Sequence, residues 1–410
     1  MSSQRTLALI GIDFALMLLG ATFCNGLAKL GTFRVYSLPS TFGYFSAALS
    51  PNDRDVSVIA GATVTDTEIQ IWDFRTAKLI AHRPLLPESA LGRSSSSTSG
   101  VYAYSNSGSR ILFCSGGYLK LLDAATLDPL KQIDLGASSW PALSPGQEAY
   151  SFIRAVAMDK RGERVAVLLQ WGTGAGGELR VYNLTSGELI KKWNYEELRG
   201  KRDRTEDFGG ADISSDGKVV SVSIIPFNLG EGSLSGTDRN VLVLDVDSGR
   251  TLSSINTGYP TGEVCFAATN PTSLLTVSAD NYDRSRSHTD SIKVWNPLTG
   301  KLLRELQRPP EGVHFQVQVS SDGNTVLGYT GLEKFTGHWW LGEEENGIVA
   351  YDRFALWNFQ RGKIIASSPE ITPAQGHRRF LLSPSGDIVL MYPGTAGGTP
   401  LTLYEVQLDK

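Results

Sequence analysis

IKVWNPLTGKLL, at residues 292–303, shares its pattern with two other stretches, IQIWDFRTAKLI at 69–80 and LRVYNLTSGELI at 179–190. Each contains an apolar run that ends in Trp or Tyr and then Asp or Asn. A turn containing Thr follows, and then a polar residue and two aliphatic ones. Weaker copies occur at residues 121–123, 243–250, 356–363 and 401–404. The seven copies lie between about 47 and 62 residues apart, and self-similarity at such spacing indicates a repeat architecture.

A second phrase, Ser-x-x-Gly or a close relative between apolar runs, precedes each copy. Its clearest instances are SSDGKVV at 214–220, SSDGNTV at 320–326 and SPSGDIV at 383–389. Gly, Asn and Asp tolerate positive φ, so such phrases favour tight hairpin turns. Each unit is therefore predicted to form four short strands rich in β-branched, aliphatic and aromatic residues.

Seven such units predict an all-β fold, a seven-bladed β-propeller of four-stranded antiparallel blades over residues 29–410. A single blade cannot bury its own faces, so we expect the Trp and Tyr residues that end the third strands to pack between blades. The last copy supplies no fourth strand after Leu401–Val406. We expect the β-like segment Phe33–Ser37 to pair there and close the ring, which removes exposed strand edges.

The two phrases resemble the WD-repeat family, in its degenerate bacterial form. The resemblance is carried by Trp72-Asp73, by the Trp-Asn pairs at Trp295 and Trp357, and by the Ser-x-Asp-Gly turns. It covers residues 33–410, and the Gly-His dipeptide typical of the family has one suitable copy, Gly376-His377. The resemblance implies a propeller that binds other proteins.

Residues 1–28 form a separate N-terminal segment whose apolar run extends from Thr6 to Cys24. Arg5 precedes the run and small residues follow it, as in a secretory signal peptide. We therefore expect export, to the periplasm or beyond the cell. An uncleaved N-terminal anchor and a cytoplasmic protein remain the alternatives, because Asp13 interrupts the run and a carboxylate is unfavourable inside a bilayer.

The overall charge narrows the range of partners, and the positions of the cysteines bear on disulfide formation. A net charge of −4 and a pI near 5.8 argue against binding to nucleic acid or to an anionic membrane. Cys114 and Cys265 fall in non-adjacent blades, so we expect two thiols and no disulfide. We expect no cofactor, no membrane span beyond the possible N-terminal anchor, and a monomeric ring.

Loop lengths indicate which face of the ring would bind. The turns after the first and third strands of each unit are short, whereas the other two kinds of connection vary widely. The expected long connections are Gly172–Gly177, Pro226–Arg239, Ala279–Ser291, Gly331–Arg353, Arg83–Gly100, Gln132–Tyr150 and Lys191–Gly210. Both variable kinds leave an antiparallel blade at the same end, and insertions gathered on one face usually mark the binding face.

The sixth unit carries the boldest insertion, which contains Phe335, Trp339, Trp340, Glu343 and Glu344. Adjacent Trp residues in a loop suggest an aromatic anchor for a protein partner, with the Glu residues as an acidic rim, because Trp is enriched at interaction hot spots. The alternative is that the indoles pack down on the ring and the Glu run is a solvated tip.

The fifth unit's insertion adds Arg284 and Arg286 to the predicted partner-binding set. It also holds Asp280, Asp283, His288 and Asp290, oxygen and nitrogen groups that could bind a metal. Their spacing matches no known metal-binding loop, so we interpret the insertion as a surface of salt bridges. GTGAGG at 172–177 matches a dinucleotide-binding pattern but joins two strands where a helix would be needed.

No catalytic motif is present: the five His residues belong to no recognisable nucleophile or metal motif, and no Gly-x-Ser-x-Gly sequence occurs. The predicted function is a non-catalytic scaffold that presents one loop-rich face to a protein partner. Two alternatives remain open. One is a propeller enzyme or enzyme subunit, similar in fold to the β-chain of quinoprotein amine dehydrogenases or to lactonases, with a site at the channel mouth. The other is a sensor of a small ligand or glycan.

Overall fold

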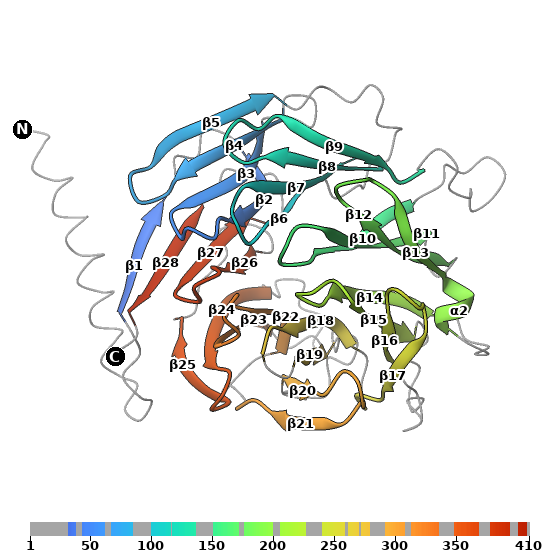
Figure 1. Cartoon of the computed structure of the whole chain (residues 1–410). Helices are drawn as coiled ribbons and strands as arrows, with labels where there is room; N and C mark the ends of the chain where they lie inside the picture. The colour runs from blue at the N-terminus through green and yellow to red at the C-terminus, as the bar shows by residue number, and fades with distance from the viewer. Residues whose placement is uncertain are drawn as a thin grey trace, which may run out of the picture.

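The computed structural model describes residues 32–37, 43–61, 67–84, 100–115, 117–136, 151–171, 176–199, 206–226, 240–258, 261–269, 272–278, 292–307, 313–335, 348–368, 378–393 and 401–407. They form seven four-stranded antiparallel sheets, arranged around a centre as the blades of a propeller (Figure 1). The predicted seven-bladed, all-β fold is confirmed.

Blades 1 to 4 follow the chain from the inside of the ring outwards. Blade 1 contains β2 (Gly43–Leu49), β3 (Asp55–Gly61), β4 (Thr67–Asp73) and β5 (Lys78–Pro84). Blade 2 contains β6 (Gly100–Tyr104), β7 (Arg110–Ser115), β8 (Tyr118–Asp123) and β9 (Pro129–Asp134). Blade 3 contains β10 (Ser151–Met158), β11 (Arg164–Trp171), β12 (Gly177–Asn183) and β13 (Leu189–Asn194). Blade 4 contains β14 (Glu206–Ile213), β15 (Val219–Pro226), β16 (Val241–Asp245) and β17 (Thr251–Ile255).

Blades 5 to 7 repeat this order. Blade 5 contains β18 (Thr261–Ala267), β19 (Ser273–Ser278), β20 (Lys293–Trp295) and β21 (Leu302–Glu305). Blade 6 contains β22 (Val313–Val319), β23 (Thr325–Phe335), β24 (Ile348–Asn358) and β25 (Lys363–Ser367). Blade 7 contains β26 (Arg378–Leu382), β27 (Ile388–Pro393) and β28 (Thr402–Gln407), and β1 (Thr32–Ser37) completes it.

The ring is closed by the two ends of the described chain, as predicted. β1 pairs antiparallel with β28, from Thr32 opposite Gln407 to Ser37 opposite Thr402. In Figure 1 the blue β1 lies beside the red β28. Blade 7 is therefore assembled from both ends of the sequence, and β28 has a neighbour on each side.

The Ser-x-x-Gly phrases form the turns between the first and second strands. In blade 6 the buried Ser320 hydroxyl accepts a hydrogen bond from the Thr325 backbone N–H at 2.9 Å and donates one to Asp322 at 2.6 Å. Gly323 adopts a φ of 74°, which favours glycine. Ser214 makes the same pair of bonds in blade 4. The repeated Ser therefore stabilises the turn between the first and second strands. Because each blade contains this turn, the phrase recurs along the sequence.

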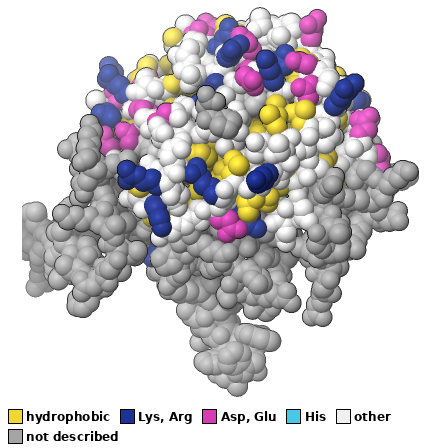
Figure 2. All heavy atoms as spheres, turned by 60° about the horizontal axis from the view of Figure 1, so that its bottom comes forward, with side chains coloured by type: hydrophobic (Ala, Val, Ile, Leu, Met, Phe, Trp, Pro, Cys, Tyr) yellow, Lys and Arg dark blue, Asp and Glu magenta, His cyan; other side chains and the backbone are white. Residues whose placement is uncertain are grey.

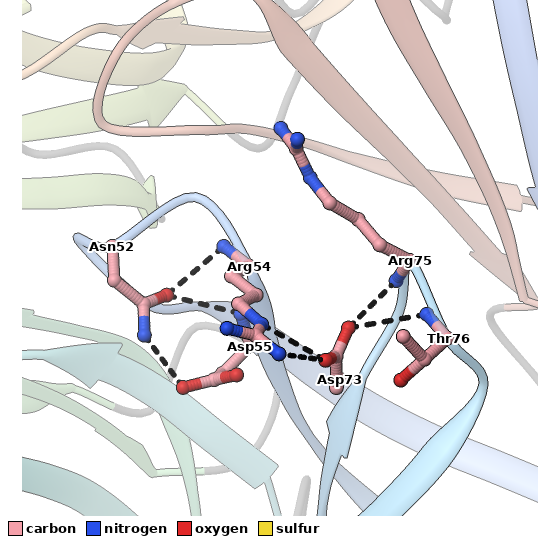
Figure 3. Close-up of polar contacts among 6 residues, drawn as sticks. All are labelled: Asn52, Arg54, Asp55, Asp73, Arg75 and Thr76. Carbon is pink, nitrogen blue, oxygen red and sulfur yellow. Dashed lines mark hydrogen bonds and ion pairs between the residues drawn. The ribbon is translucent and has the colours of Figure 1, made fainter.

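The Asp or Asn that ends each third strand caps the next turn. Asp73 accepts hydrogen bonds from the backbone N–H groups of Arg75 and Thr76 at 3.0 and 3.2 Å (Figure 3). Its other carboxylate oxygen pairs with Arg54 at 2.7 Å. Asn296 caps its turn in the same way, at 2.9 Å to Leu298 N. An amide and a carboxylate therefore serve equally as the cap, whereas only the carboxylate forms the ion pair.

The core lies between blades. Trp357 of blade 6 is fully buried against Leu275 and Val294 of blade 5, and Trp295 of blade 5 packs with Val241 of blade 4. This confirms the predicted position of the third-strand aromatics. The indole N–H groups have different acceptors from blade to blade: the Thr276 hydroxyl for Trp295, and the Gln307 backbone carbonyl for Trp357.

Two segments predicted as long loops are partly regular structure. In place of a loop over Gly331–Arg353, β23 continues to Phe335 and β24 starts at Ile348. In place of a loop over Lys191–Gly210, β13 continues to Asn194 and α2 (Tyr195–Arg199) follows. The physical reason for α2 is local: the Glu197 side chain accepts a hydrogen bond from Asn194 N at 2.9 Å, as in a capping box, and Tyr195 and Leu198 are buried.

Cys114 lies in β7 of blade 2 and Cys265 in β18 of blade 5, and both are free thiols, as expected. Cys114 is buried in the cluster between blades 2 and 3, whereas Cys265 is only partly buried. Among the described residues, no helix has the length and apolar character needed to cross a membrane.

Candidate interaction face

The strand order gives the ring two unlike faces. Connections between second and third strands, and between successive blades, leave the sheets at one end, which we call the loop-rich face. Turns after the first and third strands lie at the opposite end, the short-turn face. The long connections of the loop-rich face are residues 85–99, 137–150, 227–239, 279–291 and 336–347. The one-sided placement predicted from loop lengths therefore follows from the observed topology.

Blade 6 carries a hairpin that projects from the loop-rich face. β23 and β24 are 11 residues long, but β22 pairs with β23 only as far as Gly331, and β25 pairs with β24 only from Ala355. Within the described part of the chain, residues 332–335 therefore pair only with residues 348–351. This two-stranded ribbon extends beyond its own blade and carries residues 336–347 at its tip.

Of the predicted partner-binding residues, Phe335 is placed by the structure and the others are not. Phe335 is the last residue of β23 and lies opposite Ile348, at the outer end of the ribbon. The remaining six lie outside the described residues: Trp339, Trp340, Glu343, Glu344, Arg284 and Arg286. The first four of these belong to the segment at the ribbon tip.

A buried polar network lies beneath the loop-rich face between blades 4 and 5. The Asn240 amide oxygen accepts hydrogen bonds from the N–H and the hydroxyl of Thr257 at 3.1 and 2.9 Å. Thr257 also contacts the Thr261 hydroxyl at 2.9 Å, and Lys293 donates to the Thr257 carbonyl at 3.1 Å. Asn240 directly follows residues 227–239, and Lys293 lies two residues after the end of residues 279–291, so the network fixes the bases of two long connections. This network could not be predicted from the sequence, because its Thr and Asn residues are isolated at strand ends and form no recognisable motif.

The first strands of neighbouring blades face one another around the centre, and polar side chains join them. Asp212 of β14 accepts a hydrogen bond from the Phe266 N–H of β18 at 2.6 Å, and burial raises the pKa of its carboxyl to about 6. Gln318 of β22 bridges in the same way to Phe380 and Leu382 of β26, at 3.1 and 2.8 Å. Because these polar groups bond to the backbone of the next blade, their arrangement supports cohesion of the ring.

One side chain crosses from blade 3 to blade 6 at the short-turn face. The Lys160 ammonium donates a hydrogen bond to the backbone carbonyl of Ser321, and burial lowers the pKa of Lys160. Both residues belong to turns between first and second strands, where the Lys160 backbone also contacts its neighbours Asn106 and Ser215. This crossing lies at the short-turn end of the ring and ties blade 3 to blade 6.

In the residues that the structure describes, no group of three or more His, Cys, Asp or Glu side chains is close enough together to hold a metal ion. No protein-family model matches the chain, and no curated protein matches its sequence. The fold and the unequal faces define the class: the chain is a seven-bladed β-propeller whose variable connections share one face.

Proposed function

We propose that the protein is a non-catalytic, WD-repeat-like interaction scaffold that binds a protein partner on its loop-rich face. The observation that carries this proposal is the β23–β24 ribbon, which holds residues 336–347 beyond the edge of the blade. A pair of Trp residues, Trp339 and Trp340, occurs in this segment. Large aromatic side chains dominate the energetics of protein interfaces, so they are the natural anchors here.

The ring supplies a rigid support for such a site. The blades are joined by buried apolar clusters, and the Asn240 network holds the bases of the two connections nearest to blade 5. A preorganised surface loses less conformational entropy on binding than a mobile one. The proposal is therefore supported by the position of the β23–β24 ribbon on the loop-rich face and by the preorganised ring beneath it.

We further propose that the partner belongs to the cell envelope. The support is the sequence of residues 1–28, whose apolar run after Arg5 is typical of an exported protein. N-terminal sequencing of the chain isolated from its native cells tests this point. A new N-terminus near residue 29 supports cleavage and export, and an intact Met1 in a cytoplasmic fraction contradicts export.

The test of the binding face is affinity capture from the native cell envelope with the double variant Trp339→Ala/Trp340→Ala. We expect loss of the captured partner with the melting temperature nearly unchanged. Thr185→Ala, an exposed position on the short-turn face, is the matched control and should capture normally. Unchanged capture by the double variant would overturn the assignment, and a large loss of thermal stability would place the indoles in the core.

A further inference from the structure

The large hydrophobic side chains that are exposed in the described part of the chain share one location. All of them lie on the fourth strands of blades 1 to 5 or in the turn that leads to such a strand. Scattered exposed leucines are ordinary, but a set confined to one structural position is not. This location is the outer edge of the ring, next to the short-turn face.

A repeated β-bulge produces the exposure. In blade 1, Ile71 pairs with Ala81 and Trp72 with Leu79, so Ile80 is the extra residue between them. The extra residues in blades 2, 4 and 5 are Leu130, Leu252 and Leu303. Their exposed fractions are 52% for Ile80, 51% for Leu130, 38% for Leu252 and 48% for Leu303. A bulge re-aims a side chain, and here it turns one aliphatic residue per blade towards solvent.

Because these four residues occupy the same register in equivalent blades, they lie at the same height on the ring. We call them the outer belt. Basic residues flank it: Lys78, Arg250 and Lys301 are exposed just before the aliphatic residues, and Lys131 follows Leu130. The exposed acids Asp134 and Glu305 lie on the fourth strands of blades 2 and 5, and the exposed Glu188 lies just before the fourth strand of blade 3. Asp128 and Asp247 are paired with Arg83 and Arg164. Figure 2 shows hydrophobic side chains lying among Lys, Arg, Asp and Glu side chains on the surface it displays.

The N-terminal chain leaves the ring beside the outer belt. Thr32 lies opposite Gln407 at the end of β28, and third strands end at the short-turn face. Arg34 lies opposite Glu405, the position that Lys78 occupies opposite Asp73 in blade 1. Both ends of the described chain, Thr32 and Gln407, therefore lie at the level of the belt and away from the loop-rich face.

From these observations we infer that the outer belt docks on a lipid bilayer with anionic headgroups, with the loop-rich face directed away from it. Aliphatic side chains beside Lys and Arg fit the boundary between acyl chains and anionic headgroups. Within two residues of the outer-belt positions along the chain, five Lys or Arg residues accompany two acidic residues, Asp128 and Glu305, so the net charge of −4 does not describe this edge. The inference concerns the opposite side of the molecule from the proposed partner site and does not depend on it.

The test is hydrogen–deuterium exchange of the full chain with vesicles of phosphatidylcholine, with and without phosphatidylglycerol. We expect slower exchange in peptides covering residues 76–82, 126–132, 248–254 and 298–304 only with the anionic vesicles, with the effect reversed by high salt. The variant Lys301→Glu/Leu303→Ser should lose most of the protection in its own peptide. Lys334→Glu, the same charge change on the projecting ribbon, should leave the protection intact.

Equal exchange of the belt peptides with both kinds of vesicle would overturn the inference, as would protection confined to the loop-rich face. Protection that grows with protein concentration in the absence of vesicles would also overturn it, because it would show that the belt is covered by a second copy of the chain.

Discussion

Thr32 and Gln407 lie opposite each other in the antiparallel pair that closes the ring. This pairing has two consequences. It joins the beginning and the end of the described chain in one blade, and it places both ends on the short-turn face, away from the long connections. Both ends therefore lie on the side of the molecule opposite to the proposed partner site.

Removal of β1 should destabilise the whole ring. A chain that begins at residue 38 leaves β28 as an unpaired edge, and exposed edges promote aggregation. We expect its melting temperature to fall by more than about 5 °C, with increased light scattering. A chain that begins at residue 32 retains β1 and is the matched control. Equal stability of the two chains, measured by calorimetry, would show that the pairing contributes little.

Substitutions of Asp73 should separate its two roles. Asp73→Ala removes both the turn cap and the Arg54 ion pair, and we expect a loss of about 1–3 kcal/mol. Asp73→Asn keeps the cap, as Asn296 does in blade 5, and should lose less than about 1 kcal/mol because Arg54 is largely exposed. Chemical denaturation measures both values. Equal losses in the two variants would argue that the ion pair, and not the cap, is the main contribution.

The stability should depend on pH through Asp212. Its folded pKa is about 6, raised by burial from 3.8, so between these values the unfolded state has lost a proton that the folded state retains. Stability should therefore fall as the pH rises through this window. The full pKa shift of Asp212 corresponds to about 3 kcal/mol in the free energy of unfolding. Because the Asp212 residue is only partly buried, we expect a change in stability of about 1 kcal/mol.

Asp212→Asn should flatten this dependence, whatever constant cost it adds, because an amide does not titrate. Urea unfolding of both proteins from pH 4 to pH 7 provides the comparison. Parallel curves for the variant and the natural protein would mean that another group is responsible.

A side chain at position 328 should destabilise the protein by crowding Trp357. A Cβ at this position would lie 2.7 and 2.8 Å from two ring carbons of the fully buried Trp357. We expect Gly328→Ala to cost about 1–3 kcal/mol through overpacking. Gly258 has nothing within 4 Å and a φ of +80°, so Gly258→Ala should cost only about 1 kcal/mol, from backbone strain. Adding Trp357→Phe should recover part of the stability of Gly328→Ala; no recovery would exclude the indole as the cause.

The sequence predicts the ring well because its signals are local and repeated. The Asp or Asn of the phrase at Trp72, Trp295 and Trp357 caps a turn, and the Ser of Ser-x-x-Gly locks another. Each of these two phrases therefore marks one particular turn of a blade, and its position in the sequence predicts the strands on either side. The strand at Phe33–Ser37 was predictable for a related reason: seven repeats left one strand missing at the C-terminus.

The features that were missed depend on pairing or on contacts between blades. Gly331 resembled the start of a loop, yet the next residues pair with the strand that begins at Ile348. The crossing of Lys160 to Ser321 joins residues far apart in sequence, and no local pattern announces it. The outward position of Ile80 arises from a one-residue register shift, which composition and periodicity do not report.

The most direct test of the account is site-specific photo-crosslinking in living cells. A photoreactive residue at position 340 samples the loop-rich face, and one at position 299 or 185 samples the short-turn face. We expect a discrete protein adduct from position 340 and none from the short-turn positions. A protein adduct from the short-turn positions alone would contradict it.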